Sequence, residues 1–425
     1  MTPFSKPITS FIRDTFEDCV TPFSPSLSSN LSSPQQDRIN RDTTSTMAFF
    51  NSASNTNTGV FGGGSSSTTL TSQDPKDIEV ENPPTDGISS IAWSPQADFL
   101  AAGSWSNEVR IYEVNAQGQS VPKAAYSHEQ PVLEVIWSGD GTKIISGGCD
   151  RAARVFDVPT GQSSQVAAHE APIRKLAWLD INGQGLLATG SWDKTLKYWD
   201  LRQPTPAVSI TLPERIYTMD TVFPLMVVGT AARKIHIYHL SNPSVEYKSL
   251  DSPLKWQTRC IACFNDAQGY AVGSVEGRVA IQHVEDKQTA NNFSFKCHRK
   301  DAPVGASRLS TNTIPQVWAV NDIKFHKQHG TFATAGSDGT INMWDKDSKT
   351  RLKTFDNRGG PITSVSFNRT GAVFAYTVSY DWSQGHSGAQ AAATSNPAGA
   401  TTTAQPNKIM LHALKDDEIK KRPKK

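Results

Sequence analysis

The chain has 425 residues, and its 42 Lys and Arg residues nearly balance its 40 Asp and Glu residues. This balance excludes a protein that binds nucleic acid through a strongly basic surface overall, so any electrostatic function must be local. The five cysteines are few and odd in number, which is typical of a reducing compartment. No apolar stretch approaches the roughly 18 residues of a membrane helix and no signal-peptide pattern is present, so we expect a soluble intracellular protein.

The first segment, residues 1–73, is rich in Ser, Thr, Asn, Pro and Gly and has no sustained apolar period. Such a segment cannot bury enough apolar surface to offset the entropy of ordering. We therefore predict a disordered extension. A second plausible protein start lies inside it at Met47, so the sequence leaves open whether translation begins at Met1 or Met47.

From residue 74 to 415, one unit of short alternating strands recurs seven times. The third copy is the clearest and runs from His169 through GLLATGSWDKTLKYWDL to the dipeptide Trp199-Asp200. The other copies place an acidic residue or a histidine at the second dipeptide position, at Glu113, Asp157, His239, His283, Asp345 and His412. Spacings of 39 to 44 residues between the first five copies fit propeller blades of about 40 to 45 residues. The sequence predicts an all-β, seven-bladed β-propeller.

Three further features belong to this region. The segment DIEV at 77–80 precedes the first copy, and we predict that it adds as the outer strand of blade seven and locks the ring. The last two repeat spacings, 62 and 67 residues, predict insertions near 286–316 and 383–407. After the repeats, residues 416–425 form a basic tail whose KKRPKK hexamer is of the kind that nuclear import receptors read.

Polar residues recur at fixed places in the repeats. We expect an Asp in a tight turn to bond a His, which reaches a hydroxyl that also accepts from the Trp ring nitrogen. The clearest sets are His169, Thr189, Asp193 and Trp199 in the third copy, and His128, Ser146 and Asp150 in the second, where Phe156 replaces Trp. They imitate a Ser-His-Asp triad, but a nucleophile would occur once and not in blade after blade. We predict no catalytic residues and no enzyme.

No cofactor or metal site is predicted. Cys260 and Cys263 form a CxxC motif, but no second pair follows at zinc spacing, and residues three apart in a strand face opposite sides. Gly62 to Gly64 lack the GKS or GKT that completes a phosphate loop.

Several stretches depart from the generic repeat in a specific way. They are GSWSNEVRIYEV at 103–114, SWDKTLKYWDLR at 191–202, LPERIYTMD at 212–220, FKCHRK at 295–300, WDKDSKTRLKTF at 344–355 and AYTVSYDWSQGH at 375–386. With the repeats, these stretches resemble the WD-repeat poly(A)+ RNA export proteins of the Rae/Gle type over about residues 74–415. The resemblance implies a seven-bladed WD-repeat β-propeller that docks at the nuclear pore complex through the GLEBS motif of an FG nucleoporin.

The resemblance also implies a part in nuclear mRNA export with mRNA-protein particles, and a location in the nucleus and at the nuclear envelope with shuttling to the cytoplasm. We expect a monomeric propeller within a heteromeric complex; nothing indicates ubiquitin-like ligands or membranes. Three alternatives stay open: a kinetochore checkpoint adaptor that also reads GLEBS motifs, a direct RNA-binding protein, and a scaffold subunit of another complex.

Two groups of residues are candidates for binding. Aromatic and cationic loop residues suit an acidic partner peptide, and we assign this role to Trp105, Trp192, Arg215, Tyr217, Arg233, Lys255, Arg259, Arg278, Trp344 and Trp382. Aromatics interleaved with cations could bind RNA bases and phosphates, or an acidic protein tail. This second group, placed on the first insertion and the end of blade six, comprises Phe293, Phe295, Lys296, His298, Arg299, Lys300, Lys346, Lys349 and Arg351.

Overall fold

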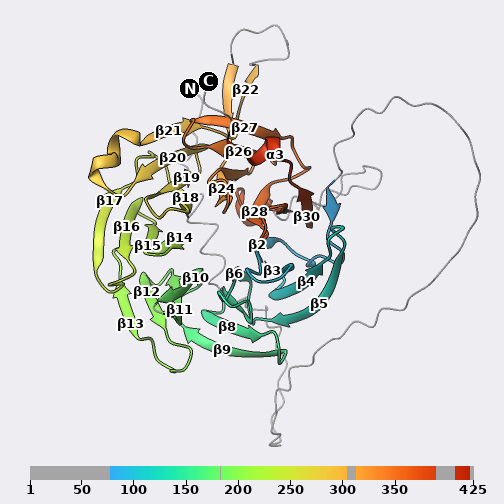
Figure 1. Ribbon diagram of the computed structural model, residues 1–425, viewed down its shortest axis with the longest axis vertical. Coiled ribbons are helices and arrows are strands. Elements are labelled where there is room, and N and C mark those ends of the chain that lie inside the picture. Colours follow the sequence, from blue (N-terminus) through green and yellow to red (C-terminus); the bar gives the residue numbers. More distant parts are fainter. Residues whose placement is uncertain (1–76, 182, 304–312, 389–406, 422–425) are drawn as a thin grey trace, which may run out of the picture.

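The computed structural model describes residues 77–181, 183–303, 313–388 and 407–421. The predictions on residues 1–73, on Gly62 to Gly64, on most of the 383–407 insertion and on residues 422–425 lie outside this part. Within it, seven antiparallel four-stranded sheets form a ring around a central channel, and one two-stranded hairpin stands apart from them (Figure 1). The predicted seven-bladed β-propeller is confirmed.

In each of the first six blades the strands follow one another from the channel outward. Blade one contains β2 (Ile88–Trp93), β3 (Phe99–Ser104), β4 (Glu108–Val114) and β5 (Ser120–Ser127). Blade two contains β6 (Val132–Trp137), β7 (Lys143–Gly148), β8 (Ala152–Asp157) and β9 (Gln162–Ala168). Blade three contains β10 (Ile173–Ile181), β11 (Gln184–Ser191), β12 (Thr195–Trp199) and β13 (Val208–Thr211). Blade four contains β14 (Ile216–Val222), β15 (Leu225–Thr230), β16 (Lys234–His239) and β17 (Glu246–Asp251). Blade five contains β18 (Thr258–Cys263), β19 (Gly269–Ser274), β20 (Arg278–His283) and β21 (Phe293–Lys296). Blade six contains β24 (Val320–Phe325), β25 (Phe332–Gly336), β26 (Ile341–Asp345) and β27 (Thr350–Phe355).

The core lies between the blades, so inner strands must be apolar on both faces. All six residues of β15 are buried. Its Met226 and Val228 pack towards blade three, whereas Leu225 and Val227 pack towards blade five. A strand sandwiched in this way loses the polar alternation of a half-exposed strand, so the sequence of β15, LMVVGT, shows no apolar–polar alternation.

Neighbouring blades are also joined by hydrogen bonds between their innermost strands. The Thr218 hydroxyl accepts from the Ile261 amide at 2.9 Å, and the Asp322 carboxylate accepts from the Val365 amide at 3.0 Å. These bonds satisfy polar backbone groups that face the channel, where an unpaired amide would be costly.

Blade seven combines both ends of the repeat region. It contains β28 (Ile362–Phe367), β29 (Val373–Val378) and β30 (Lys408–Ala413), and its outer strand is β1 (Ile78–Glu79). In register, Ile78 lies opposite Leu411 and Glu79 opposite Met410. The predicted closure by the segment at 77–80 is confirmed.

The C-terminal boundary of the propeller differs from the expectation. Residues Asp416–Ile419 form the short helix α3, which packs against blade six next to β27 (Figure 1). Ile419 is buried, and its carbonyl accepts from the Thr331 hydroxyl at 2.7 Å. The start of the expected basic tail is therefore part of the folded body, because an apolar residue of the helix covers the end of the blade.

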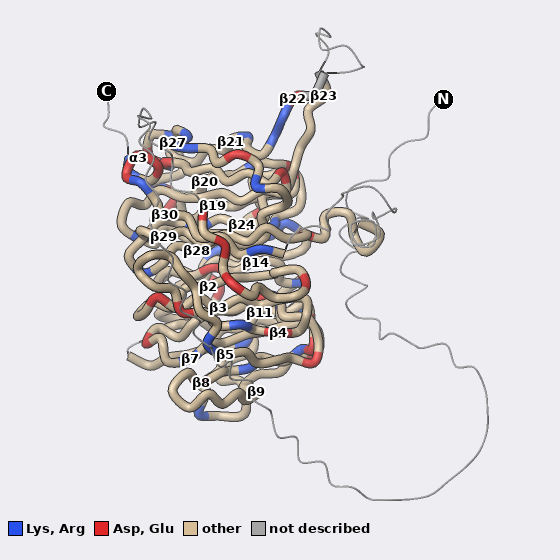
Figure 2. Tube along the Cα trace, turned by 90° about the vertical axis from the view of Figure 1, so that its right-hand side faces the viewer, with Lys and Arg blue, Asp and Glu red and all other residues tan. Residues whose placement is uncertain are grey.

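The first insertion is also smaller than predicted. Residues Asp286–Asn291 form a 3₁₀ helix, η1, and β21 then completes blade five. What remains is a hairpin of β22 (Arg299–Pro303) and β23 (Thr313–Val317), which projects from the edge of the ring (Figure 2). The repeat spacing could not separate an outer blade strand from inserted sequence, because short outer strands are exposed and carry a weak pattern.

Candidate functional site

The polar sets of the repeats are hydrogen-bonded inside the blades. In blade three, His169 lies 2.8 Å from Asp193 and 2.7 Å from the Thr189 hydroxyl, which accepts from the Trp199 ring nitrogen at 2.8 Å. Burial acts to raise the pKa of Asp193, but its bonds with His169 and Thr195 outweigh it and hold that pKa well below the usual value. Because the Thr189 hydroxyl is hydrogen-bonded to both His169 and Trp199, its role is structural.

Blade two has Phe156 where blade three has Trp199, so its polar network needs another hydrogen-bond donor. His128 contacts Asp150 at 2.8 Å and the Ser146 hydroxyl at 2.7 Å. The donor that Phe156 cannot supply comes from Tyr126, whose hydroxyl donates to Ser146 at 2.8 Å while its ring stacks on Phe156. The polar chain is complete although the dipeptide is not.

Blade six contains a third network of this kind, and it corrects two assignments. His298 contacts Asp338 at 2.9 Å and the Thr334 hydroxyl at 3.0 Å, and Trp344 donates its ring N–H to the same hydroxyl at 3.0 Å. His298 is buried. The assignment of His298 to a nucleic-acid surface is therefore wrong, and Trp344 belongs to the blade and not to the channel mouth.

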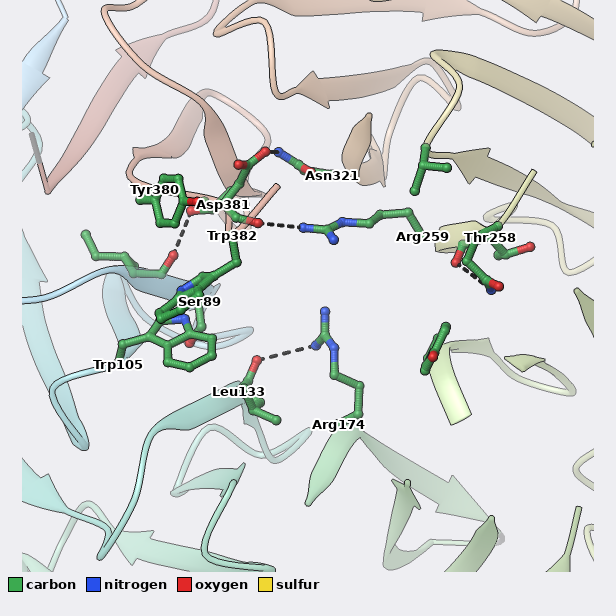
Figure 3. A pocket seen from close by; sticks show the side chains of 15 residues that line it. Ser89, Trp105, Leu133, Arg174, Thr258, Arg259, Asn321, Tyr380, Asp381 and Trp382 are labelled. Atoms are coloured by element: carbon green, nitrogen blue, oxygen red, sulfur yellow. Dashed lines mark hydrogen bonds between the residues drawn. The ribbon is translucent and has the colours of Figure 1, made fainter. Parts of the chain in front are cut away.

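The candidate binding site lies at one end of the channel. There, each inner strand has a β-bulge near its first residue. One bulge residue from every blade lines a pocket at the mouth: Ser89, Leu133, Arg174, Tyr217, Arg259, Asn321 and Thr363. We call these residues the bulge ring. Bulges re-aim side chains, and here they turn seven equivalent positions towards one opening (Figure 3).

An aromatic pair forms one wall of this pocket. Trp105, in the turn between β3 and β4, and Trp382, after β29, have ring centroids 4.3 Å apart. Both rings line the pocket and are partly exposed. Large, partly exposed aromatic rings at the centre of a concave surface are typical binding hot spots.

Two guanidinium groups reach into the mouth, Arg174 from blade three and Arg259 from blade five (Figure 3). Arg259 donates to the Asp381 carbonyl at 3.1 Å, and in the described part of the chain it has no carboxylate partner within ion-pair distance. Glu134 is 3.9 Å from Arg174 but gives its closer contact, 2.7 Å, to Lys175. Burial lowers the pKa of Arg174, the charge of Glu134 opposes this and that of Arg259 adds to it. An anion placed between the two guanidinium groups would be attracted by both.

Four of the residues predicted to bind a peptide line this pocket, namely Trp105, Tyr217, Arg259 and Trp382. Trp192 lies behind them: its ring is buried against Leu133 and Cys149, with Trp105 and Tyr217 packed on the same cluster. It supports the wall and does not face a ligand, so a direct contact by Trp192 is a wrong assignment.

The remaining cations of the first group do not line the mouth. Arg233 and Lys255 are exposed on blade four, where Arg233 donates to the Leu254 carbonyl at 3.2 Å. Arg215 is half-buried next to Glu214, and Arg278 pairs with Glu276 at 3.6 Å. All of these cations lie near turns in the sequence, and that proximity could not tell them apart from the bulge-ring residues that do line the mouth.

The second group is divided between two places. On β21, Phe293 and Phe295 turn inwards onto the blade five core while Lys296 faces solvent. Arg299 is tied to the carbonyls of Glu276 and Gly277, and Lys300 is exposed on β22.

Among the blade six members, Lys349 and Arg351 are exposed, whereas the Lys346 side chain is largely buried and pairs with Asp347 at 2.6 Å. Lys349 lies 4.8 Å above the Phe293 ring, Lys346 4.9 Å above Phe264, and Arg351 5.9 Å from Trp344. We call Lys346, Lys349 and Arg351 the blade six cations.

Some pocket residues escaped the sequence analysis, above all Arg174. The signal was available, because Arg174 and Arg259 occupy the same place in copies three and five, one residue after the start of the inner strand. Aligning the copies on this position would have placed both at one opening.

Other kinds of site are not found. Across the described ranges, no cluster of three or more His, Cys, Asp or Glu side chains could hold a metal ion. The same residues include no helix with the length and apolar character needed to span a membrane.

The fold and the mouth define a class: a WD-repeat propeller with a concave, aromatic and cationic binding surface. A family profile described as the anaphase-promoting complex subunit 4 WD40 domain matches residues 86–181, and one described as the WD domain, G-beta repeat, matches residues 310–345. The poly(A)+ RNA export protein of Schizosaccharomyces pombe is 54% identical over 82% of this chain and 94% of its own length.

Other relatives agree. The mRNA export factor GLE2 of Chaetomium thermophilum is 50% identical over 86% of this chain and 98% of its own length. The protein Rae1 of Drosophila melanogaster is 46% identical over 73% and 89%. The chain belongs to the WD-repeat family of mRNA export factors that contains these proteins, as its sequence motifs predicted.

Proposed function

We propose that this protein is a nonenzymatic adaptor in nuclear mRNA export that binds the GLEBS motif of an FG nucleoporin at the channel mouth. The observation that supports this most is the pair of guanidinium groups, Arg174 and Arg259, beside the Trp105 and Trp382 wall. A peptide carboxylate between the two arginines would receive charge-assisted hydrogen bonds, and apolar peptide side chains would cover the indole rings. Function at the nuclear pore complex and shuttling of mRNA-protein particles follow from this partner.

The test is the affinity of the purified full chain for a GLEBS peptide, measured by isothermal titration calorimetry. Removing one partner of a desolvated charge pair at an interface costs about 2 to 5 kcal/mol, which corresponds to at least about thirtyfold in affinity. We expect Arg174→Glu and Arg259→Glu each to weaken binding by that factor. Lys287→Glu, an equal charge change at an exposed residue on η1, is the matched control and should keep full affinity.

Unchanged affinity in both arginine variants would overturn the site. Arg259→Gln separates binding from folding, because it removes the charge but keeps a polar side chain. Its unfolding transition should remain close to that of the unchanged protein while peptide affinity falls.

A second binding function is supported by the blade six cations. They lie over aromatic rings, so they would meet phosphates or acidic side chains before any base reached those rings. We propose that this surface contacts RNA backbone or an acidic protein tail. Poly(A) affinity measured against salt concentration tests the RNA role: Lys349→Glu should reduce the salt slope by about one counterion, and a flat salt response would contradict phosphate contact.

A further inference from the structure

A second concave surface lies at the other end of the blades. Strand β14 begins beside Tyr217 at the channel mouth and ends at Val222, next to a groove between blades four and five. The groove is lined by Leu225, Ile237, Tyr238 and Val284 from the blade bodies. We call it the blade four–five groove. It shares no residue with the pocket at the mouth.

Apolar side chains at this groove are unusually open to solvent. Tyr247, which lines it, is 52% exposed, and Phe223 and Val245, in the turns that adjoin it, are 55% and 56% exposed. Scattered single exposed apolar residues need no explanation, but several around one concave surface indicate a binding site.

The charged side chains that line the groove are acidic, and Lys248 lies beside it, where its ammonium donates to the Val284 carbonyl at 3.0 Å. Asp266 and Glu285 line it, and no Lys or Arg does. Neither carboxylate has an ion-pair partner among the described residues; Glu285 accepts only from the Tyr247 hydroxyl at 3.4 Å. Two unpaired carboxylates next to exposed aromatic surface suit a ligand that carries Lys or Arg on an aliphatic stem.

The chain itself brings such residues to this rim. Ile419 anchors helix α3 under blade six, and Lys421 pairs with Asp347. The contact with Asp347, together with the charges of Asp345 and Asp266, raises the pKa of the Lys421 ammonium. The turn that holds Asp266 is joined to the β24–β25 turn of blade six, because the Asn265 side-chain amide donates to the His326 and Lys327 carbonyls at 2.8 and 2.9 Å. The same blade six turn contains Thr331, the partner of Ile419. The residues that follow Lys421 are Arg422, Pro423, Lys424 and Lys425.

We propose that the blade four–five groove binds the basic segment 422–425 of this chain in an intramolecular contact. Four extended residues reach at most about 13 to 14 Å, and in the proposed contact they run from Lys421 past the turn at Asp266 towards Glu285. A short tether holds the tail at an effective concentration in the millimolar range, so weak ion pairs suffice. The contact occupies the lysine-rich segment 420–425 and shields it from receptors for basic peptides.

Disulfide trapping in the full chain tests this contact. A Cys19→Ser background leaves the described cysteines, all of which are buried. Gln268→Cys in the groove is combined with Lys424→Cys, and Gln203→Cys with Lys424→Cys is the matched control; both glutamines are exposed, and Gln203 lies on blade three. Under mild oxidation we expect the groove pair to form its disulfide at least tenfold faster than the control pair.

The dependence of the trapping rate on charge is the second measurement. Asp266→Asn with Glu285→Gln should slow trapping at least threefold, and so should raising the salt concentration, because exposed ion pairs are screened. Equal rates for the groove and control pairs, or trapping indifferent to the two carboxylates, would overturn the proposal. Cross-linked dimers in place of cross-linked monomers would also overturn it and assign the groove to a second copy. None of these results depends on peptide binding at the channel mouth.

Discussion

A buried charged cluster lies where the ring closes, and the substitution Asp77→Asn tests how much this cluster stabilises the ring. The Asp77 carboxylate lies 2.6 Å from the His412 ring and 3.3 Å from Arg358, and it accepts from the Tyr376 hydroxyl. On its other side His412 contacts Glu418 of α3 at 3.0 Å. The cluster therefore links strand β1, strand β30 and the C-terminal helix, and removal of its central charge should loosen blade seven.

The pKa of His412 sets the size and the pH range of the effect. Burial alone would lower this pKa, but the bonds to Asp77 and Glu418 raise it to about 9. A rise of about 2.5 from the ordinary value corresponds to about 3 kcal/mol, and screening by nearby solvent reduces this to about 2 kcal/mol. Because the folded pKa is raised, this stabilisation is complete below pH 6.5 and is lost as the pH rises through 9.

The stability that the Asp77 and Glu418 carboxylates contribute has the opposite pH dependence. The bonds from His412 and Tyr376 outweigh burial and lower the pKa of Asp77, and the bond from His412 likewise lowers that of Glu418. Their contribution is present above about pH 4 and is lost as the pH falls through the lowered values. The cluster should therefore stabilise the ring most between about pH 4.5 and 6.5.

Urea unfolding followed by tryptophan fluorescence at pH 6 and pH 9.5 measures this effect. We expect Asp77→Asn to lower the free energy of unfolding by about 2 to 3 kcal/mol at pH 6 and by about half as much at pH 9.5. His239→Asn, at an exposed histidine of blade four, should show no such pH dependence. An equal loss at both pH values would refute the electrostatic reasoning and leave only a packing effect.

Three further predictions concern the blade interiors. Trp199→Phe should destabilise the protein by about 1 kcal/mol in urea unfolding, because Thr189 loses a donor; no loss would show that this hydrogen bond does not stabilise the blade. Tyr126→Phe should cost a similar amount, about 1 kcal/mol, if its hydroxyl replaces the missing tryptophan of blade two, and Tyr247→Phe, at an exposed ring, is its control. Burial raises the pKa of the Cys260 and Cys263 thiols, so alkylation followed by mass spectrometry should leave both unmodified until unfolding; rapid native labelling would contradict their burial.

The mouth shows where sequence reasoning succeeded and where it stopped. Trp105 and Trp382 were identified as aromatic loop residues, but the contact between their rings, which are tilted by 31°, joins blade one to blade seven, and no sequence spacing predicts it. Arg174 was overlooked because it stands in an apolar strand segment, where alternation predicts a half-buried side chain. Its orientation depends on a β-bulge, which adds a residue to the strand without a mark in the sequence.

The opposite error occurred at Trp344 and His298. Both have the composition of a binding surface, an aromatic ring and an imidazole near several cations. The blade six turn contains Asp338 and the strand beside it contains Thr334, which complete the same polar network as in blade three. Residue type alone could not distinguish the two roles, because the deciding factor is the hydrogen-bond partner.

The sequence by itself determined the number of blades, the polar networks of blades two and three, the closing strand at 77–80 and the family. These are repeated or local features, and repetition reveals them when one copy is weak. The tertiary structure alone decided which side chains meet at the channel mouth, at the closure cluster and at the blade four–five groove. The channel mouth and the groove bring together residues from different blades, whose proximity depends on the curvature of the closed ring and on bulges that spacing does not encode. The closure cluster brings together the two ends of the repeat region and helix α3.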